Sequence, residues 1–355
     1  MKEVFSVIIL HYNQPDYLYT AIDSVLAQSY PAIQLIFSDD GSLDFSVENI
    51  ERYIHEKKQK NIIDFKVIRH QKNVGTVKNL NEAYSQCIGK YVLQFAADDA
   101  LYDSEVLAQF SRALNNVSKE TIGVFARSLD CDENLVWTGK EYLAPDKAEY
   151  FSLLTAEEQY RKFIYRCDIH MGSTAFIMDK LREILPLDQK YHLLDDWPLI
   201  LRFSFADFKA LLYRAGGVSR PLKERDIRLT RYICQDHLRV FEQEIFPYSK
   251  RLNLKELCDI TKRYDHDRKW MKRATGEFES RRRIEILSND KRFLLRMIKK
   301  IISYQGLLTV VLGILLLNCL LNYLDKMVLF FLLICFVAVM LQDLLQIKRY
   351  LFNTY

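Results

Sequence analysis

The sequence predicts an α/β protein in which a mostly parallel sheet is flanked by helices, followed by a basic helical segment and a C-terminal hairpin of two membrane helices. Three observations support this prediction. Short apolar runs alternate with segments of helical periodicity through the first hundred residues, a pattern typical of a parallel sheet. Residues 251–300 carry 16 Lys and Arg against 8 Asp and Glu. Two long apolar runs follow this basic block.

Strands are expected where apolar runs end in turn-forming residues, and helices where apolar residues recur every three or four positions. The expected strands are residues 5–10, 33–37, 65–68, 91–95, 122–127 and 173–178. The expected helices are residues 18–26, 47–56, 77–87, 156–165 and 197–205. We therefore expect one α/β domain over residues 1–225, a helical, basic juxtamembrane region over 226–300 and a two-helix anchor over 301–355.

The C-terminal apolar runs have the length of membrane segments. Residues 306–324 contain no charge, and 19 residues at about 1.5 Å each roughly span the hydrocarbon core of a bilayer. The second run covers residues 327–341, and extending it to Ile347 includes Gln342 and Asp343. The alternative is a buried helical hairpin or an interface between copies of the chain, so a homo-oligomer is possible.

Charges around these runs predict their orientation. Lys299 and Lys300 precede the pair, and Lys348 and Arg349 follow it, so both ends are expected on the cytoplasmic side. The N-terminus has no signal-peptide pattern. We expect the protein at the cell membrane with its large N-terminal part in the cytoplasm. The basic segment then rests on an anionic membrane surface, or is simply a solvated helical face, and no nucleic acid partner is expected.

Composition excludes several classes of protein. Hydrophobic residues make up 49% of the chain and charged residues 27%, with only 11 Gly and 7 Pro, which excludes a disordered or collagen-like chain. The 7 cysteines are widely spaced, without a CxxC pair or a Cys/His cluster. This spacing predicts reduced thiols and neither a disulfide framework nor a zinc site.

Two pairs of aspartates directly follow predicted strands. Asp39 and Asp40 come after QLIFS, and Asp98 and Asp99 come after YVLQFAA. An Asp-Asp-Gly sequence at a strand end can be merely a turn in which an aspartate side chain caps the backbone. Two such pairs in one sheet also suit Mg²⁺ or Mn²⁺ bridging a diphosphate, because both cations prefer hard oxygen ligands.

Two longer stretches resemble the glycosyltransferase family 2 signature in order and spacing. They are SVIILHYNQPDYLYTAIDSVLAQSYPAIQLIFSDDGS and NVGTVKNLNEAYSQCIGKYVLQFAADD, and the resemblance covers about residues 4–220. It implies a GT-A fold, a nucleotide-sugar donor with a UDP-sugar as first choice, a Mn²⁺ or Mg²⁺ cofactor, and inversion at the anomeric carbon. It also implies an enzyme of the polysaccharide-assembly type with C-terminal membrane segments.

The resemblance assigns roles to matching positions. Tyr12 and Asp40 would contact the base of the nucleotide, with Asp39 nearby, and Asp98 and Asp99 would hold the ribose and the metal-diphosphate. The loop beside the diphosphate or ribose would carry Asn73, Gly75 and Lys78. The chain departs from the family at two places: Leu10-His11 stands where the family often has Pro-Thr, and Ala96 where it often has a further Asp.

A third acidic pair, Asp195-Asp196, precedes a predicted helix. It could simply cap that helix, since Pro198 lies in the first turn. Its position resembles the family's Glu/Asp-Asp motif, which makes Asp196 the expected general base and Asp195 the orienting carboxylate. His170 is a candidate for the acceptor pocket or a structural histidine. Arg214 is a candidate phosphate contact or part of a Gly-Gly turn.

These patterns predict a metal-dependent glycosyltransferase that extends a lipid-linked glycan acceptor in cell-surface polysaccharide synthesis, as of a capsule or exopolysaccharide. A polyprenyl-phosphate glycosyltransferase is the first alternative, because enzymes that charge a lipid phosphate often carry two C-terminal membrane helices. Its anionic acceptor needs no base, so the Asp195-Asp196 pair argues against it. The second is a non-catalytic membrane scaffold that binds a sugar nucleotide. Tethering to a bilayer would suit a lipid-linked acceptor, because it raises the effective concentration of the enzyme there.

Overall fold

The computed structural model of the chain describes residues 3–132, 136–141, 150–167, 169–221 and 227–275. The chain divides into two units, Met1–Gly276 and Glu277–Tyr355. The second unit lies outside the described residues, so the account below concerns the first.

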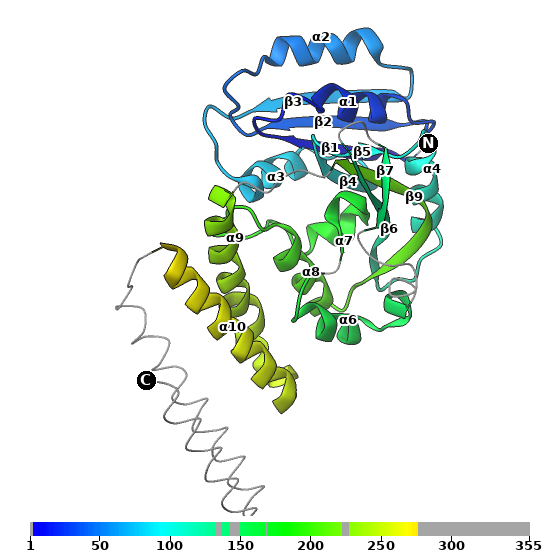
Figure 1. Cartoon of the computed structure of the whole chain (residues 1–355). Helices are drawn as coiled ribbons and strands as arrows, with labels where there is room; N and C mark the ends of the chain where they lie inside the picture. The colour runs from blue at the N-terminus through cyan, green and yellow to red at the C-terminus, as the bar shows by residue number, and fades with distance from the viewer. Residues whose placement is uncertain (1–2, 133–135, 142–149, 168, 222–226, 276–355) are drawn as a thin grey trace, which may run out of the picture. The chain divides into compact units, whose positions relative to one another are not determined.

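The N-terminal half of the sheet confirms the predicted alternation of strands and helices (Figure 1). Its four parallel strands have the order β3-β2-β1-β4. They are β1 (Phe5–His11), β2 (Ile33–Asp39), β3 (Ile62–Arg69) and β4 (Tyr91–Ala96). The connecting helices are α1 (Leu18–Leu26), α2 (Val47–Lys57) and α3 (Thr76–Ser85). Because the strands are parallel, their carboxyl ends share one edge of the sheet, where α/β proteins bind ligands.

The C-terminal half of the sheet is mixed, so the expectation of a mostly parallel sheet is wrong there. The strand β8 (Thr174–Ile177) is antiparallel to β4 on one side and to β6 (Thr121–Cys131) on the other. It begins at the carboxyl edge of β4 and runs back, so Ile177 pairs with Tyr91 at the start of β4. Antiparallel strands can pair without a helical crossover between them. Because β8 begins at the carboxyl edge of β4, the residues just before β8 lie at that edge.

The remaining described elements complete the first unit. The strands are β5 (Ala100–Leu101), β7 (Trp137–Glu141) and β9 (Lys209–Pro221). The helices are α4 (Val106–Leu114), α6 (Ala156–Phe163), α7 (Met178–Arg182), α8 (Asp196–Phe205), α9 (Ile227–Val240) and α10 (Leu254–Thr275). Short non-α helical turns are η1 (Met171–Ser173), η2 (Phe241–Ile245) and η3 (Phe246–Arg251).

Two apolar cores lie on opposite faces of the sheet, as the alternation along β1 requires. Val7 and Ile9 belong to the core formed with α1, α2 and α4, whereas Ile8 belongs to the core formed with α3, α6 and α8. Phe241, Ile260 and Tyr264 are buried in this second core. The helical region that follows residue 226 therefore contributes, as far as residue 275, to the same core as the sheet.

No helix among the described residues is both long and apolar enough to cross a membrane. The predicted membrane runs, residues 306–324 and 327–347, lie outside the described part of the chain. The C-terminal hairpin accordingly stays a prediction.

Candidate functional site

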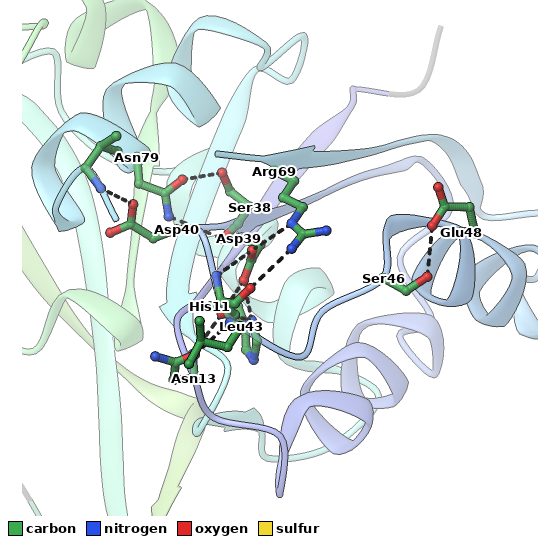
Figure 2. Close-up of polar contacts among 12 residues, drawn as sticks. His11, Asn13, Ser38, Asp39, Asp40, Leu43, Ser46, Glu48, Arg69 and Asn79 are labelled. Carbon is green, nitrogen blue, oxygen red and sulfur yellow. Dashed lines mark hydrogen bonds and ion pairs between the residues drawn. The ribbon is translucent and has the colours of Figure 1, made fainter. Parts of the chain in front are cut away.

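The first acidic pair closes a tight turn at the carboxyl end of β2 (Figure 2). Asp39 is fully buried, and its carboxylate contacts His11 Nδ1 at 2.8 Å, Ser42 Oγ at 2.5 Å and the Ser42 N–H at 3.0 Å. Burial alone would raise the pKa of Asp39, but these hydrogen bonds outweigh it, and the pKa is lowered. The Asp39 side chain thus caps the backbone of a turn, as one of the two interpretations of this pair requires. His11, which stands where the family often has Thr, holds the Asp39 carboxylate in place.

Asp40 fixes the loop that leads into α3. Its Oδ1 accepts the Val74 N–H at 2.6 Å and its Oδ2 accepts the Gly75 N–H at 3.0 Å. Burial raises the pKa of Asp40 against the effect of these bonds. Gly41 permits the close approach, because its φ is +74° and a Cβ there would lie 2.5 Å from the Lys72 carbonyl carbon.

The residues predicted to bind a nucleotide gather at this edge of the sheet. Gly75 begins α3 with φ +92°, Lys78 lies in the first turn of that helix, and Asn73 is exposed on the preceding loop. Tyr12 follows β1 and is 45% exposed, so its ring is accessible to a ligand. Contact of these side chains with a nucleotide stays a prediction.

Asn79 was not singled out from the sequence, yet it ties α3 to the end of β2. Its amide exchanges two hydrogen bonds with Ser38, at 2.5 Å to the hydroxyl and 3.2 Å to the carbonyl oxygen. It is buried within a helix of ordinary amphipathic pattern, and an asparagine there gives no local signal of its role.

The second acidic pair follows β4, and the chain before β8 brings His170 to it. Asp99 is buried, and a Cβ on Gly172 would lie 3.1 Å from Asp99 Oδ2 and 2.9 Å from His170 Cε1. Gly172 therefore packs closely against both Asp99 and His170, with little space for a larger residue at this position. His170 lies beside the predicted metal ligand, a neighbour that its place in the sequence did not reveal.

The Asp98 and Asp99 side chains fit a divalent cation that is also bound by the phosphates of the substrate. Among the described residues, no group of three or more His, Cys, Asp and Glu side chains is placed to hold a metal ion. Mg²⁺ is commonly bound through one or two carboxylates together with substrate phosphates and waters. Asp98 and Asp99 match that donor set, whereas a complete protein cage is not present in this part of the chain.

The third acidic pair lies at the start of α8 and is linked to β4. The Gln94 side chain donates to Asp195 Oδ2 at 2.7 Å, and the Tyr84 hydroxyl donates to Gln94 Oε1. Asp195 occupies the N-cap position but makes no side-chain cap. Asp196 Oδ1 accepts the Trp197 N–H at 2.6 Å. The hydrogen bond from the Trp197 N–H to Asp196 suits a residue at the start of a helix. The hydrogen bond from Gln94 to Asp195 is not a capping contact.

The two carboxyl groups are partly exposed yet surrounded by protein, and their protonation is linked. Burial and, after it, the charge of Asp196 raise the pKa of Asp195 to about 7. Burial also raises the pKa of Asp196, although the Trp197 N–H and the Cys167 thiol oppose this. A carboxylate of this pair can accept a proton when it is ionised, which is what a general base requires.

The raised pKa of Asp195 predicts a specific pH dependence of stability. Its folded-state pKa, about 7, exceeds the ordinary value of 3.8, so the group favours folding below about pH 4 and loses this contribution as pH rises through 7. Asp195→Asn should therefore reduce the fall in thermal stability of the wild type between pH 5 and pH 8. Thermal unfolding at both pH values, with the exposed Asp103→Asn as control, tests this; parallel curves for wild type and Asp195→Asn would contradict it.

Arg214 lies on β9, at a register shift in its pairing with β6. Ala126 pairs with Tyr213, but the next residue, Arg127, pairs with Gly217. Residues 214–216 are therefore extra residues in the strand; Gly216 ends this bulge, and pairing resumes at Gly217. A phosphate contact by Arg214 stays a prediction.

The carboxylates at the carboxyl edge of an α/β sheet place the chain among proteins that bind ligands at that edge. The sequence profile of the family described as Glycosyl transferase family 2 matches residues 6–185, half of the chain. An uncharacterized glycosyltransferase of Haemophilus influenzae is 30% identical over 188 residues, covering 51% of this chain and 73% of that protein. The chain belongs to glycosyltransferase family 2, and it is a glycosyltransferase.

More distant similarities agree with this assignment. Glycosyltransferase GlyG of Streptococcus pneumoniae is 24% identical over 151 residues, 42% of this chain and 48% of that protein. The mannosyltransferase PcManGT of Pyrobaculum calidifontis, solved with GDP-Man and Mn²⁺, has a TM-score of 0.53 at 15% identity. The match covers 83% of this chain and 81% of PcManGT, and it supports a GT-A-like fold.

Proposed function

We propose that the chain is a metal-dependent, inverting glycosyltransferase that moves a sugar from a nucleotide-sugar donor, a UDP-sugar first, to a hydroxyl of a lipid-linked glycan. The observation that carries this proposal is the Asp195-Asp196 pair, with a raised pKa and a link through Gln94 to the strand that leads into Asp98 and Asp99. A base beside the donor site is what a hydroxyl acceptor requires.

The reaction needs one proton acceptor and one displacement. Asp196 accepts the proton of the acceptor hydroxyl as its oxygen attacks the anomeric carbon, and the bond from that carbon to the diphosphate breaks with its electron pair leaving on the diphosphate. A single displacement inverts the anomeric carbon. Gln94 orients Asp195 beside Asp196. A divalent cation held by Asp98 and Asp99 would neutralise the leaving diphosphate.

Transfer to a bare polyprenyl phosphate is the second candidate, because two predicted membrane segments suit a lipid substrate. The two candidate functions differ in the acceptor that receives the sugar, so an assay with both acceptors distinguishes them. Purified full-length protein is offered UDP-glucose, UDP-galactose, UDP-GlcNAc, UDP-GalNAc and GDP-mannose, with Mn²⁺ or EDTA, and either polyprenyl phosphate or a lipid-diphosphate-linked sugar. Transfer only to the linked sugar supports the proposal, and transfer to the bare phosphate replaces it with the second candidate.

We also propose a cytoplasmic face of the cell membrane as the site of action, in cell-surface polysaccharide synthesis. The apolar runs and flanking charges support the location. Deleting residues 306–355 should release the protein from membranes while donor binding persists, since the described site lies wholly before residue 276. Membrane flotation and nucleotide titration measure the two effects. A deleted protein that no longer folds would favour a buried hairpin instead.

A further inference from the structure

A single buried carboxylate on α9 holds the backbone just before the catalytic pair. Asp236 is 0% exposed. Its Oδ2 accepts the backbone N–H groups of His192, Leu193 and Leu194 at 2.9, 2.8 and 3.1 Å. Successive N–H groups that converge on one point form an anion-binding concavity, and here the protein fills it with its own side chain.

Arg239 strengthens this arrangement from the same helix. Its Nη1 lies 2.9 Å from Asp236 Oδ1 and donates to the Lys190 carbonyl oxygen at 2.6 Å. Both oxygens of Asp236 are thus engaged, and the chain is attached to α9 on both sides of Tyr191. Hydrogen bonds to an ionised acceptor are roughly twice as strong as neutral ones.

The held segment lies between the two halves of the site. Leu194 is followed directly by Asp195 and Asp196. At the other end, a Cβ on Gly75 would lie 2.7 Å from His192 Nδ1 and 2.8 Å from the His192 carbonyl oxygen, so His192 packs directly against the loop that Asp40 fixes. The Tyr232 ring, also from α9, lies 4.6 Å from the His192 ring.

We propose that Asp236 is a positioning residue for transfer: it fixes residues 192–194, and through them the distance between the Asp195-Asp196 pair and the donor loop at Gly75. This inference rests on the proposed function. None of the sequence motifs includes Asp236, and its role is to act through the backbone, without contacting substrate.

Asp236→Asn is the test, because an amide offers one acceptor oxygen and directs its NH₂ group at either Arg239 or the three N–H donors. We expect kcat for the best donor of the panel above to fall roughly 10- to 100-fold, since a 1 Å misplacement can cost about that much. The donor KM should change by less than about threefold, because Asp40 and not Asp236 fixes the donor loop. Amide exchange in the full-length chain should accelerate at residues 192–194.

Glu244→Gln is the matched control. Glu244 is also a buried carboxylate paired with an arginine, Arg202 at 3.0 Å. Its contact near the segment is with the Tyr191 hydroxyl, which donates to Glu244 Oε1 at 3.3 Å, whereas the N–H groups of residues 192–194 donate to Asp236. If Glu244→Gln lowers the thermal midpoint as much as Asp236→Asn, it should leave both kcat and the exchange at residues 192–194 near wild type. An equal loss of kcat in the two variants would reduce Asp236 to general stability and overturn the proposal.

Two further outcomes are distinguishable. Should Asp236→Asn not fold, Asp236→Glu retains the charge and shifts the oxygens by one methylene group; normal kcat despite faster exchange at residues 192–194 overturns the proposal. Should the wild type transfer no sugar from the panel, the proposed function fails. Amide exchange then decides whether Asp236 holds residues 192–194. Unchanged exchange at these residues in the variant overturns the proposal that Asp236 fixes them.

Discussion

Loss of the Asp99 carboxylate is expected to abolish cation-dependent binding of the nucleotide donor. Asp99 is buried beside His170 just after β4, and Gly172 packs closely against its Oδ2. Two aspartates can hold a divalent cation only with the help of substrate phosphates, so removing one of them leaves too few ligands. Titration of Asp99→Ala with UDP and with GDP, in Mn²⁺ and in EDTA, should give the same weak binding in both conditions.

Asp99→Asn separates charge from packing. The amide has nearly the same shape but no negative charge, so it should lose the Mn²⁺ effect as Asp99→Ala does, with a smaller loss of thermal stability. Asp103→Asn, which alters an exposed aspartate four residues further on, should keep the full Mn²⁺ effect. Undiminished Mn²⁺-dependent binding in both Asp99 variants would show that Asp99 is not a metal ligand.

Asp196→Asn is expected to reduce the rate of sugar transfer by roughly 10² or more, because an amide cannot accept the proton of the acceptor hydroxyl. Donor affinity should persist, since Asp40, Asp98 and Asp99 are untouched. Steady-state transfer to the lipid-linked acceptor gives kcat, and titration with the nucleotide gives the affinity. The hydrogen bond from the Trp197 N–H can still form with the amide oxygen, so the start of α8 should be retained.

The neighbouring carboxylate supplies the comparison. Asp195→Asn keeps an oxygen that can accept the hydrogen bond from Gln94 and leaves Asp196 in place as the proton acceptor, so it should cause a smaller loss of rate than Asp196→Asn. A near-normal rate for Asp196→Asn would leave that residue with only its role at the start of α8. A large loss confined to Asp195→Asn would exchange the two assignments.

The first four strands could be predicted from the sequence because each is a short apolar run, and a helix of clear periodicity follows each of the first three. The helix α4 was missed although its apolar residues also recur at helical spacing. Other missed elements lacked these features. The strand β5 has two residues, and β9 contains a Gly-Gly bulge that resembles a turn. The direction of β8 was also beyond local analysis, because the same apolar run fits a parallel or an antiparallel neighbour.

The candidate site also contains residues that could be predicted from the sequence and residues that could not. The first two acidic pairs directly follow predicted parallel strands, so their position at one edge of the sheet followed from the topology. Gln94 and Asp236 act across long separations in sequence, on Asp195 and on residues 192–194. A polar residue within an apolar strand or an amphipathic helix does not reveal its partner. Such partners are decided by packing, and only the folded chain identifies them.

The position of α9 bears on how short a working fragment of this protein can be. The sequence alone predicts an α/β domain over residues 1–225, with a separate helical region after it. A fragment cut there would lack Asp236 and Arg239, and the concavity formed by the N–H groups of residues 192–194 would lose its acceptor. It would also lack Phe241, Ile260 and Tyr264, which are buried in the core beneath α8. We therefore expect the smallest working fragment to extend through α9 and into α10.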